Sequence, residues 1–199
     1  MFNEAFIPGA TAVGITFKEG VVLGAEKRIA YGRFIVSSSG KKVFTITDTV
    51  GAAFAGMIGD MQILVREMTS YVKLREMEIR RNMTPQSVAK LMSVLLFERR
   101  FAPFITQTIL GGIDDKPYIY VLDPLGSVIP DDYACVGSGA ETALGVIDSD
   151  FKNNMDEERS KELVASSIRS ACKRDAASGN GIDLLILTSK GSKIESMSL

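Results

Sequence analysis

The sequence contains no histidine at any of its 199 positions. Imidazole is the usual proton carrier near neutral pH, and it is also a common zinc ligand. Its absence excludes Ser-His-Asp and Cys-His catalysis and His-ligated zinc, unless a partner chain supplies the residue. Any hydrolytic reaction carried out by this chain must therefore use another base.

Cysteine is also scarce, with Cys135 and Cys172 as the two thiols. They lack metal-ligand spacing, and two isolated thiols fit a reducing compartment better than a disulfide framework. No apolar run reaches the roughly 18 residues that a membrane span needs. The opening MFNEAFIPG lacks the basic start and long apolar core of a signal peptide. We therefore expect a cytoplasmic protein without a membrane segment.

Neither sign of charge is in excess, since 23 basic and 24 acidic side chains are interspersed and leave a net charge of −1. No charged block suggests a surface for nucleic acid, which we do not expect as a partner. No ligand cluster and no phosphate-binding glycine loop is present, so we expect neither a metal nor an organic cofactor. With 46% hydrophobic residues, the chain can bury one sizeable core.

The first half of the chain predicts strands followed by two helices. Residues 12–49 alternate short apolar runs with glycine and charged turns, a pattern typical of an antiparallel sheet. Residues 61–77 have apolar side chains at helical spacing, and a second helix is predicted from Thr84, with Pro85 at its first position. We expect these side chains to face the core: Met61, Leu64, Val65, Met68 and Val72, then Val88, Leu91, Met92 and Leu95.

The second half repeats this order. Hairpin strands are predicted up to about residue 139, followed by helices near 139–151 and 157–174, the latter capped by Asp156. The final apolar run, residues 182–188, is short and flanked by turns, which indicates a strand buried on both faces. Strands and helices in blocks predict an α+β fold, with antiparallel sheets in the middle and helix pairs outside.

Five polar residues in apolar or glycine-rich surroundings are candidates for chemistry: Glu26 in GAEKR, Lys42 in GKKVF, Ser138 in VGSGA, and Asp175 and Ser178 in KRDAASGNG. Each alone has a simpler interpretation. Glu26 and Lys42 can be solvated hairpin charges, VGSGA can be a tight turn before a helix, and DAASG can be a helix end.

Taken together, these residues indicate a site. A lysine whose pKa is lowered by burial or by nearby cations can act as a base without histidine, and an acidic neighbour would fix its position. Such a lysine needs a hydroxyl or amine nucleophile and a backbone N–H that holds the oxyanion. Gly56, at the end of a small-residue strand before a helix, is a plausible donor.

The motif order over essentially the whole chain resembles the β-subunits of the 20S proteasome, above all the archaeal ones: ATAVGI, GAEKR, GKKVF, AFAGMIGDMQ, GGID, YVLDPLGS, YACVGSGAETALGVID and KRDAASGNGID. The resemblance implies an N-terminal-nucleophile hydrolase fold, a four-layer α-β-β-α sandwich with two antiparallel sheets between helix pairs. It also implies a propeptide-like leader at residues 1–9 and a single β-type domain at residues 10–199. The extra N-terminal helix of the related α-subunits is missing.

The nucleophile of this family is a threonine, which is freed when the leader is cut after a glycine. By resemblance that cut lies between Gly9 and Ala10, so alanine occupies the nucleophile position. The resemblance also assigns the other catalytic roles. Lys42 would tune the nucleophile's proton, and Glu26 would pair with Lys42. The α-amino group would be surrounded by Ser138, Asp175 and Ser178, and the Gly56 N–H would form the oxyanion hole. It implies a substrate pocket with apolar preference at Ile29, Gly40, Phe44, Phe54, Ile58 and Gln62.

An alanine methyl group cannot attack a carbonyl, so we expect a chain that neither releases its leader nor cleaves peptides. Thr11 is a poor substitute, because neighbouring strand residues point to opposite faces and its hydroxyl would be directed away from Lys42. The alanine is either natural, in a silent β-type, or a replaced threonine that traps the unprocessed form. The presence of Gly9 and of the lysine and acidic residues favours a replaced threonine, although the same charged residues can also serve ring assembly.

The resemblance implies partners as well: α-subunits and other β-subunits in stacked seven-membered rings, an ATPase unfoldase reached through the α-ring, and unfolded polypeptide substrates. One rival hypothesis is a purely structural ring component, whose helix face between Met61 and Met77 would suit packing between subunits. A weaker one is an unrelated amidase of the same hydrolase class that acts on small substrates.

Overall fold

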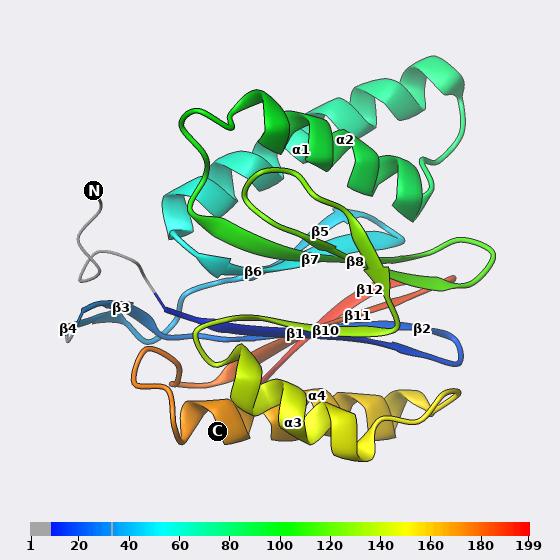
Figure 1. The fold of residues 1–199 in the computed structure, drawn as a ribbon. Helices are drawn as coiled ribbons and strands as arrows, with labels where there is room; N and C mark the ends of the chain where they lie inside the picture. The colour runs from blue at the N-terminus through cyan, green and yellow to red at the C-terminus, as the bar shows by residue number, and fades with distance from the viewer. Residues whose placement is uncertain (1–8, 33) are drawn as a thin grey trace.

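Two five-stranded antiparallel sheets lie face to face, and a pair of helices covers the outer face of each (Figure 1). The computed structural model describes residues 9–32 and 34–199, so the expected leader lies outside this range except for Gly9. The arrangement confirms the α+β fold, with sheets in the middle and helix pairs outside, that the sequence predicted. No helix in the described part of the chain is long and apolar enough to cross a membrane.

The first sheet has the strand order β10-β1-β2-β11-β12. Its strands are β1 (Thr11–Phe17), β2 (Gly20–Glu26), β10 (Tyr133–Gly137), β11 (Ile182–Thr188) and β12 (Gly191–Met197). The predicted buried strand is confirmed as β11, which lies between β2 and β12 and is buried along almost its whole length. The β12 strand was not predicted, because its sequence GSKIESM is mostly exposed and polar at the sheet edge.

The second sheet has the order β5-β6-β7-β8-β9. Its strands are β5 (Val43–Thr47), β6 (Val50–Gly56), β7 (Thr106–Ile113), β8 (Pro117–Leu122) and β9 (Ile129–Asp131). A separate two-stranded hairpin, β3 (Ile29–Tyr31) with β4 (Phe34–Ser37), projects beyond the sheets in Figure 1. The sequence predicted the β4 segment but not β3.

The helices form where the apolar periodicity predicts them. They are α1 (Ile58–Ile79), α2 (Pro85–Glu98), α3 (Ala140–Asp150) and α4 (Glu157–Cys172). Both predicted caps are confirmed, since Thr84 accepts a hydrogen bond from the Ser87 N–H and Asp156 accepts one from the Arg159 N–H. These bonds satisfy amide groups in the first helical turn, which have no partner within the helix.

Three apolar clusters hold the four layers together. One lies between α1, α2 and the β5–β9 sheet, a second lies between α3, α4 and the other sheet, and a third fills the space between the sheets. The predicted core faces are confirmed in α1 and α2, where Val65 and Leu91 are half-buried and the other predicted side chains are buried. Ala10, which precedes β1, and Ala12 within it belong to the cluster between the sheets.

Candidate functional site

Lys42 and Glu26 form a buried ion pair. Glu26 ends β2, and Lys42 directly precedes β5, so each of the two sheets contributes one partner. The side chains are 2% and 0% exposed, and the Lys42 Nζ contacts Glu26 Oε1 and the carbonyl oxygen of Arg28. The other carboxylate oxygen of Glu26 accepts from the N–H groups of Arg28 at 2.7 Å and Gly179 at 3.0 Å. The simpler interpretation of two solvated hairpin charges is therefore wrong.

Burial shifts the pKa of both partners toward the neutral form. Desolvation lowers the pKa of Lys42 below its usual 10.5, and the charge of Glu26 opposes this shift without cancelling it. Desolvation likewise raises the pKa of Glu26 above 4.5, against the attraction of Lys42 and the two backbone N–H donors. A lysine with a lowered pKa gives up its proton more readily than a solvent-exposed lysine does.

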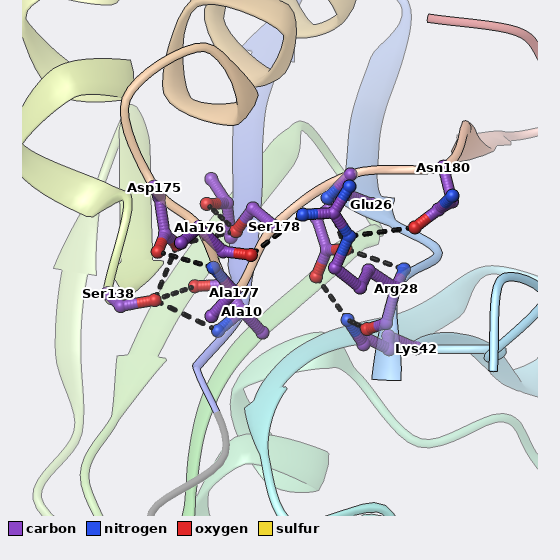
Figure 2. A network of polar contacts seen from close by, with 12 residues as sticks. Ala10, Glu26, Arg28, Lys42, Ser138, Asp175, Ala176, Ala177, Ser178 and Asn180 are labelled. Atoms are coloured by element: carbon purple, nitrogen blue, oxygen red, sulfur yellow. Dashed lines mark hydrogen bonds and ion pairs between the residues drawn. The ribbon is translucent and has the colours of Figure 1, made fainter. Parts of the chain in front are cut away.

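Ala10 lies in a second hydrogen-bonded group, centred on Ser138 and Asp175 (Figure 2). The Ala10 N–H donates to Ser138 Oγ at 3.1 Å, and Ser138 Oγ donates to Asp175 Oδ2 at 2.6 Å. The Ser178 hydroxyl donates to the same carboxylate oxygen at 2.7 Å. The structure thus joins Ser138, Asp175 and Ser178 in one hydrogen-bonded group, in which Ser138 contacts the backbone nitrogen of Ala10. The roles that the resemblance assigns to these residues remain predictions.

Thr11 points away from the side chain of Ala10. Its hydroxyl is buried and bonded to Ser178 Oγ at 2.8 Å, and it packs so closely over Gly139 that a Cβ there would lie 2.1 Å from it. Ala10 belongs instead to the cluster between the sheets. Strand alternation separates the two side chains, which supports the expectation that Thr11 does not replace the missing nucleophile.

A pocket of about 390 Å³ opens beside Gly9 and contains Gly56, Gly137 and Ser138 in its lining. Gly56 has φ +136°, and a Cβ at this position would lie 2.2 Å from the Ile105 carbonyl oxygen. Only glycine fits this backbone conformation and this close approach. Gly56, the predicted oxyanion donor, thus lines the same pocket as Gly9, the residue before the predicted cut.

The six residues predicted to form a substrate pocket do not line this pocket. Ile29 packs on Gly40, where a Cβ would lie 2.5 Å from the Ile29 side chain. Phe54 is fully buried and packs edge-to-face on Phe44, with ring centroids 5.8 Å apart. Both rings and Ile58 pack in the α1–α2 cluster, whereas Gln62 is exposed. Their role as a substrate pocket remains a prediction.

Two residues that the sequence did not single out contribute to the site. Gln107 of β7 accepts a hydrogen bond from the Gly137 N–H of β10 at 2.8 Å, so this bond links the two sheets beside the pocket. Arg28 follows Glu26 by two residues and hydrogen-bonds to the segment that contains Asp175 and Ser178. The GAEKR motif offered a signal for Arg28, since two basic residues follow a buried carboxylate; an exposed strand glutamine offers none.

The arrangement brings together a buried lysine–carboxylate pair, a polar group that contacts the nitrogen of residue 10, and a glycine-lined pocket. Ala10 has no hydroxyl, and its nitrogen belongs to the peptide bond with Gly9, where resonance withdraws the lone pair that a basic amine would offer. Among the described residues, no cluster of His, Cys, Asp and Glu has the arrangement to hold a metal ion.

Comparison with known proteins agrees with this geometry. Residues 8–187 match the family described as proteasome subunit. Proteasome subunit beta 1 of Nitrosopumilus maritimus (strain SCM1) is 53% identical over 188 residues, which cover 94% of this chain and 95% of the relative. Proteasome subunit beta 1 of Cenarchaeum symbiosum (strain A) is also 53% identical, over 94% of this chain and 97% of the relative.

A third relative comes from a different archaeon. Proteasome subunit beta 2 of Pyrobaculum calidifontis (strain DSM 21063 / JCM 11548 / VA1) is 45% identical over 192 residues, which cover 96% of this chain and 95% of the relative. The similarity therefore extends over almost the full length of each protein. The chain belongs to the proteasome subunit family and is a β-subunit with archaeal relatives, which assembles with other proteasome subunits for protein degradation.

Proposed function

We propose that this β-subunit contributes a complete catalytic framework without a nucleophile, so that it keeps its leader and does not cleave peptides. One observation carries the proposal: the residue whose N–H donates to Ser138 Oγ is an alanine, which has no side-chain hydroxyl. A methyl group cannot attack a carbonyl carbon, and an amide nitrogen is not a base. The buried Lys42 then has no hydroxyl proton at position 10 to accept.

The retained framework supports restoration by a single change. Ala10→Thr adds a hydroxyl at the position whose N–H donates to Ser138 Oγ, with Lys42 as the candidate base and the Gly56 N–H as the candidate oxyanion donor. We expect the variant to release residues 1–9 and then to cleave fluorogenic peptides with apolar residues before the cut. Both results are measured in assembled particles, by intact mass and by fluorescence.

Ala10→Val is the matched control, because valine has nearly the shape of threonine but no hydroxyl. It should leave the intact mass unchanged and the peptides uncut. Adding Lys42→Met to Ala10→Thr should abolish both gains. If Ala10→Thr forms proper rings and still keeps its leader, more than the nucleophile is missing and the proposal fails.

The setting that we propose is the one that the family resemblance implies. The chain would sit with α-subunits and other β-subunits in stacked seven-membered rings in the cytoplasm, with unfolded polypeptides delivered by an ATPase unfoldase. Native mass spectrometry of the co-expressed subunits tests the ring composition. A particle without this chain would contradict the assignment.

A second candidate function is that of a purely structural subunit. It is favoured by large apolar side chains of α1 that remain exposed in the single chain, among them Tyr71 at 48%, Leu74 at 56% and Met77 at 70%. Such a face suits packing between subunits. Under this alternative, Leu74→Glu would block ring assembly, and Ala10→Thr would produce no activity in rings that form normally.

A further inference from the structure

Arg28 holds an irregular segment of the chain with its side chain. Its Nε donates to Asn180 Oδ1 at 2.7 Å, and its Nη1 donates to the carbonyl oxygen of Ala176 at 2.7 Å (Figure 2). The guanidinium also packs against Gly179, where a Cβ would lie 2.3 Å from Nη2. Arg28 thus contacts three positions within five consecutive residues.

That segment, residues 173–181, joins α4 to β11 and contains no helix or strand. Asp175 and Ser178 both lie on it, and Asp175 accepts from Ser138, whose Oγ in turn accepts from the Ala10 N–H. A segment without regular backbone bonding depends on individual contacts for its position. Several contacts come from outside the segment. Ser138 Oγ donates to Asp175, and the Thr11 hydroxyl bonds to Ser178. The Glu26 carboxylate and the Lys27 N–H bond to its backbone, and Arg28 adds two side-chain donors.

The backbone of Arg28 contacts the buried ion pair at the same time. Its N–H donates to Glu26 Oε2 at 2.7 Å, and its carbonyl oxygen accepts from the Lys42 Nζ. One residue therefore bonds the candidate base through its backbone and the Asp175–Ser178 segment through its side chain. The two hydrogen-bonded groups of the site meet at Arg28.

We propose that Arg28 is a positioning residue: its guanidinium fork fixes the 175–180 segment relative to the Glu26–Lys42 pair, so that Asp175 and Ser178 are aligned with position 10. It touches neither Ala10 nor the pocket beside Gly9 in the described structure. A planar fork suits this task, because its donors have fixed relative directions, whereas the single ammonium of lysine has none.

The first test measures activity, and this arm rests on the proposed function, because it uses assembled particles that carry Ala10→Thr. Adding Arg28→Ala should lower kcat by about tenfold or more and leave KM within about twofold, since misalignment affects the chemical step rather than binding. Arg28→Lys should be impaired as well, because it retains the charge but loses the fork. Methylguanidinium added to the Arg28→Ala particle should restore part of kcat.

Arg174→Ala is the matched control. Arg174 is a neighbouring exposed arginine of the same segment, and its side chain makes no hydrogen bond or ion pair with other described residues. Its removal should leave kcat within about twofold of the parent. Arg28→Ala with unchanged kcat in intact rings would overturn the proposal, as would an equal loss from Arg174→Ala.

The second test needs no activity and uses the chain with Ala10 in its assembled particle. Arg28→Ala should speed amide hydrogen exchange in residues 176–181 by about tenfold or more, while the central turns of α4 keep their protection. Unchanged exchange in the segment would contradict the proposal. If Ala10→Thr proves silent, the proposed function fails, and this measurement still decides the role of Arg28.

Discussion

Because Glu26 and Lys42 form a buried pair, we expect the loss of Glu26 and the loss of Lys42 to lower the free energy of unfolding by different amounts. Glu26→Leu would leave the Lys42 ammonium with the Arg28 carbonyl as its remaining described acceptor, and it would deprive the N–H groups of Arg28 and Gly179 of theirs. An uncompensated buried charge costs about 3–5 kcal/mol, and each orphaned N–H adds about 1–3 kcal/mol. We expect a loss of roughly 5 kcal/mol or more in the free energy of unfolding.

Lys42→Met should cost less, about 3 kcal/mol, because Glu26 keeps two N–H donors and can take up a proton. The double variant should recover about 2 kcal/mol or more relative to the sum of the single losses. For a chain of this size, a loss of 5 kcal/mol lowers Tm by about 10–20 °C. Urea unfolding of the purified chain, followed by circular dichroism, measures all three variants.

The pH dependence of Lys42→Met tests the same reasoning. Burial raises the pKa of Glu26 in the folded chain, and without Lys42 this pKa should rise further. Between the unfolded pKa and the folded pKa the folded state holds the extra proton, so stability falls as pH rises through this window. The deficit of Lys42→Met relative to the parent should therefore be smaller at pH 5 than at pH 8.

Two outcomes would refute this account of the pair. If both single variants unfold within about 1 kcal/mol of the parent, the pair is not the buried, desolvated contact described above. If Lys42→Met loses more stability than Glu26→Leu at neutral pH, the two backbone N–H donors do not offset the cost of burying the Glu26 carboxylate without its lysine. Either result would also weaken the case for Lys42 as a base with a lowered pKa.

Three further predictions concern the surroundings of the site. Gly137→Ala should lower the free energy of unfolding by about 2 kcal/mol or more, because φ is +98° and a Cβ would lie 2.0 Å from the Ala10 carbonyl oxygen. Gly145→Ala should not destabilise α3, because a Cβ there meets no atom within 4 Å. Thr11→Val should cost about 1 kcal/mol through its lost buried hydrogen bond, and Thr11→Ser should cost less in the same urea titration. Burial raises the pKa of the Cys135 thiol to about 12, so the unfolded state loses this proton at a lower pH than the folded state does. Between pH 8 and pH 10.5 the parent should therefore lose about 2 kcal/mol more stability than Cys135→Val.

Much of the fold could be predicted from local sequence patterns. Helical spacing of apolar residues marked α1 and α2, and the capping residues Thr84 and Asp156 marked two helix starts that the structure confirms. The edge strand β12 was not predicted, since three of its first four residues are polar or glycine and the strand has little buried surface. Periodicity reports burial on one face, so a mostly exposed strand gives little signal.

The candidate site was predictable in part. Family motifs pointed to Lys42, Glu26, Ser138, Asp175 and Ser178, and hydrogen bonds in the structure join them into two groups. Composition and spacing alone left the charged residues indistinguishable from solvated hairpin charges. Burial distinguishes the two interpretations, and burial depends on how the two sheets pack.

The sequence by itself determined that position 10 has no nucleophile, since the side chain of an alanine is the same in every fold. Only the tertiary structure decided that Arg28 bonds to Ala176 and Asn180, residues that lie 148 and 152 positions further along the chain. Local patterns reflect neighbours within a few residues, whereas these contacts depend on the pairing of β2 with β11, which brings distant segments together. The missing hydroxyl at position 10 could therefore be read from the sequence, but the contacts that Arg28 makes with distant residues could not.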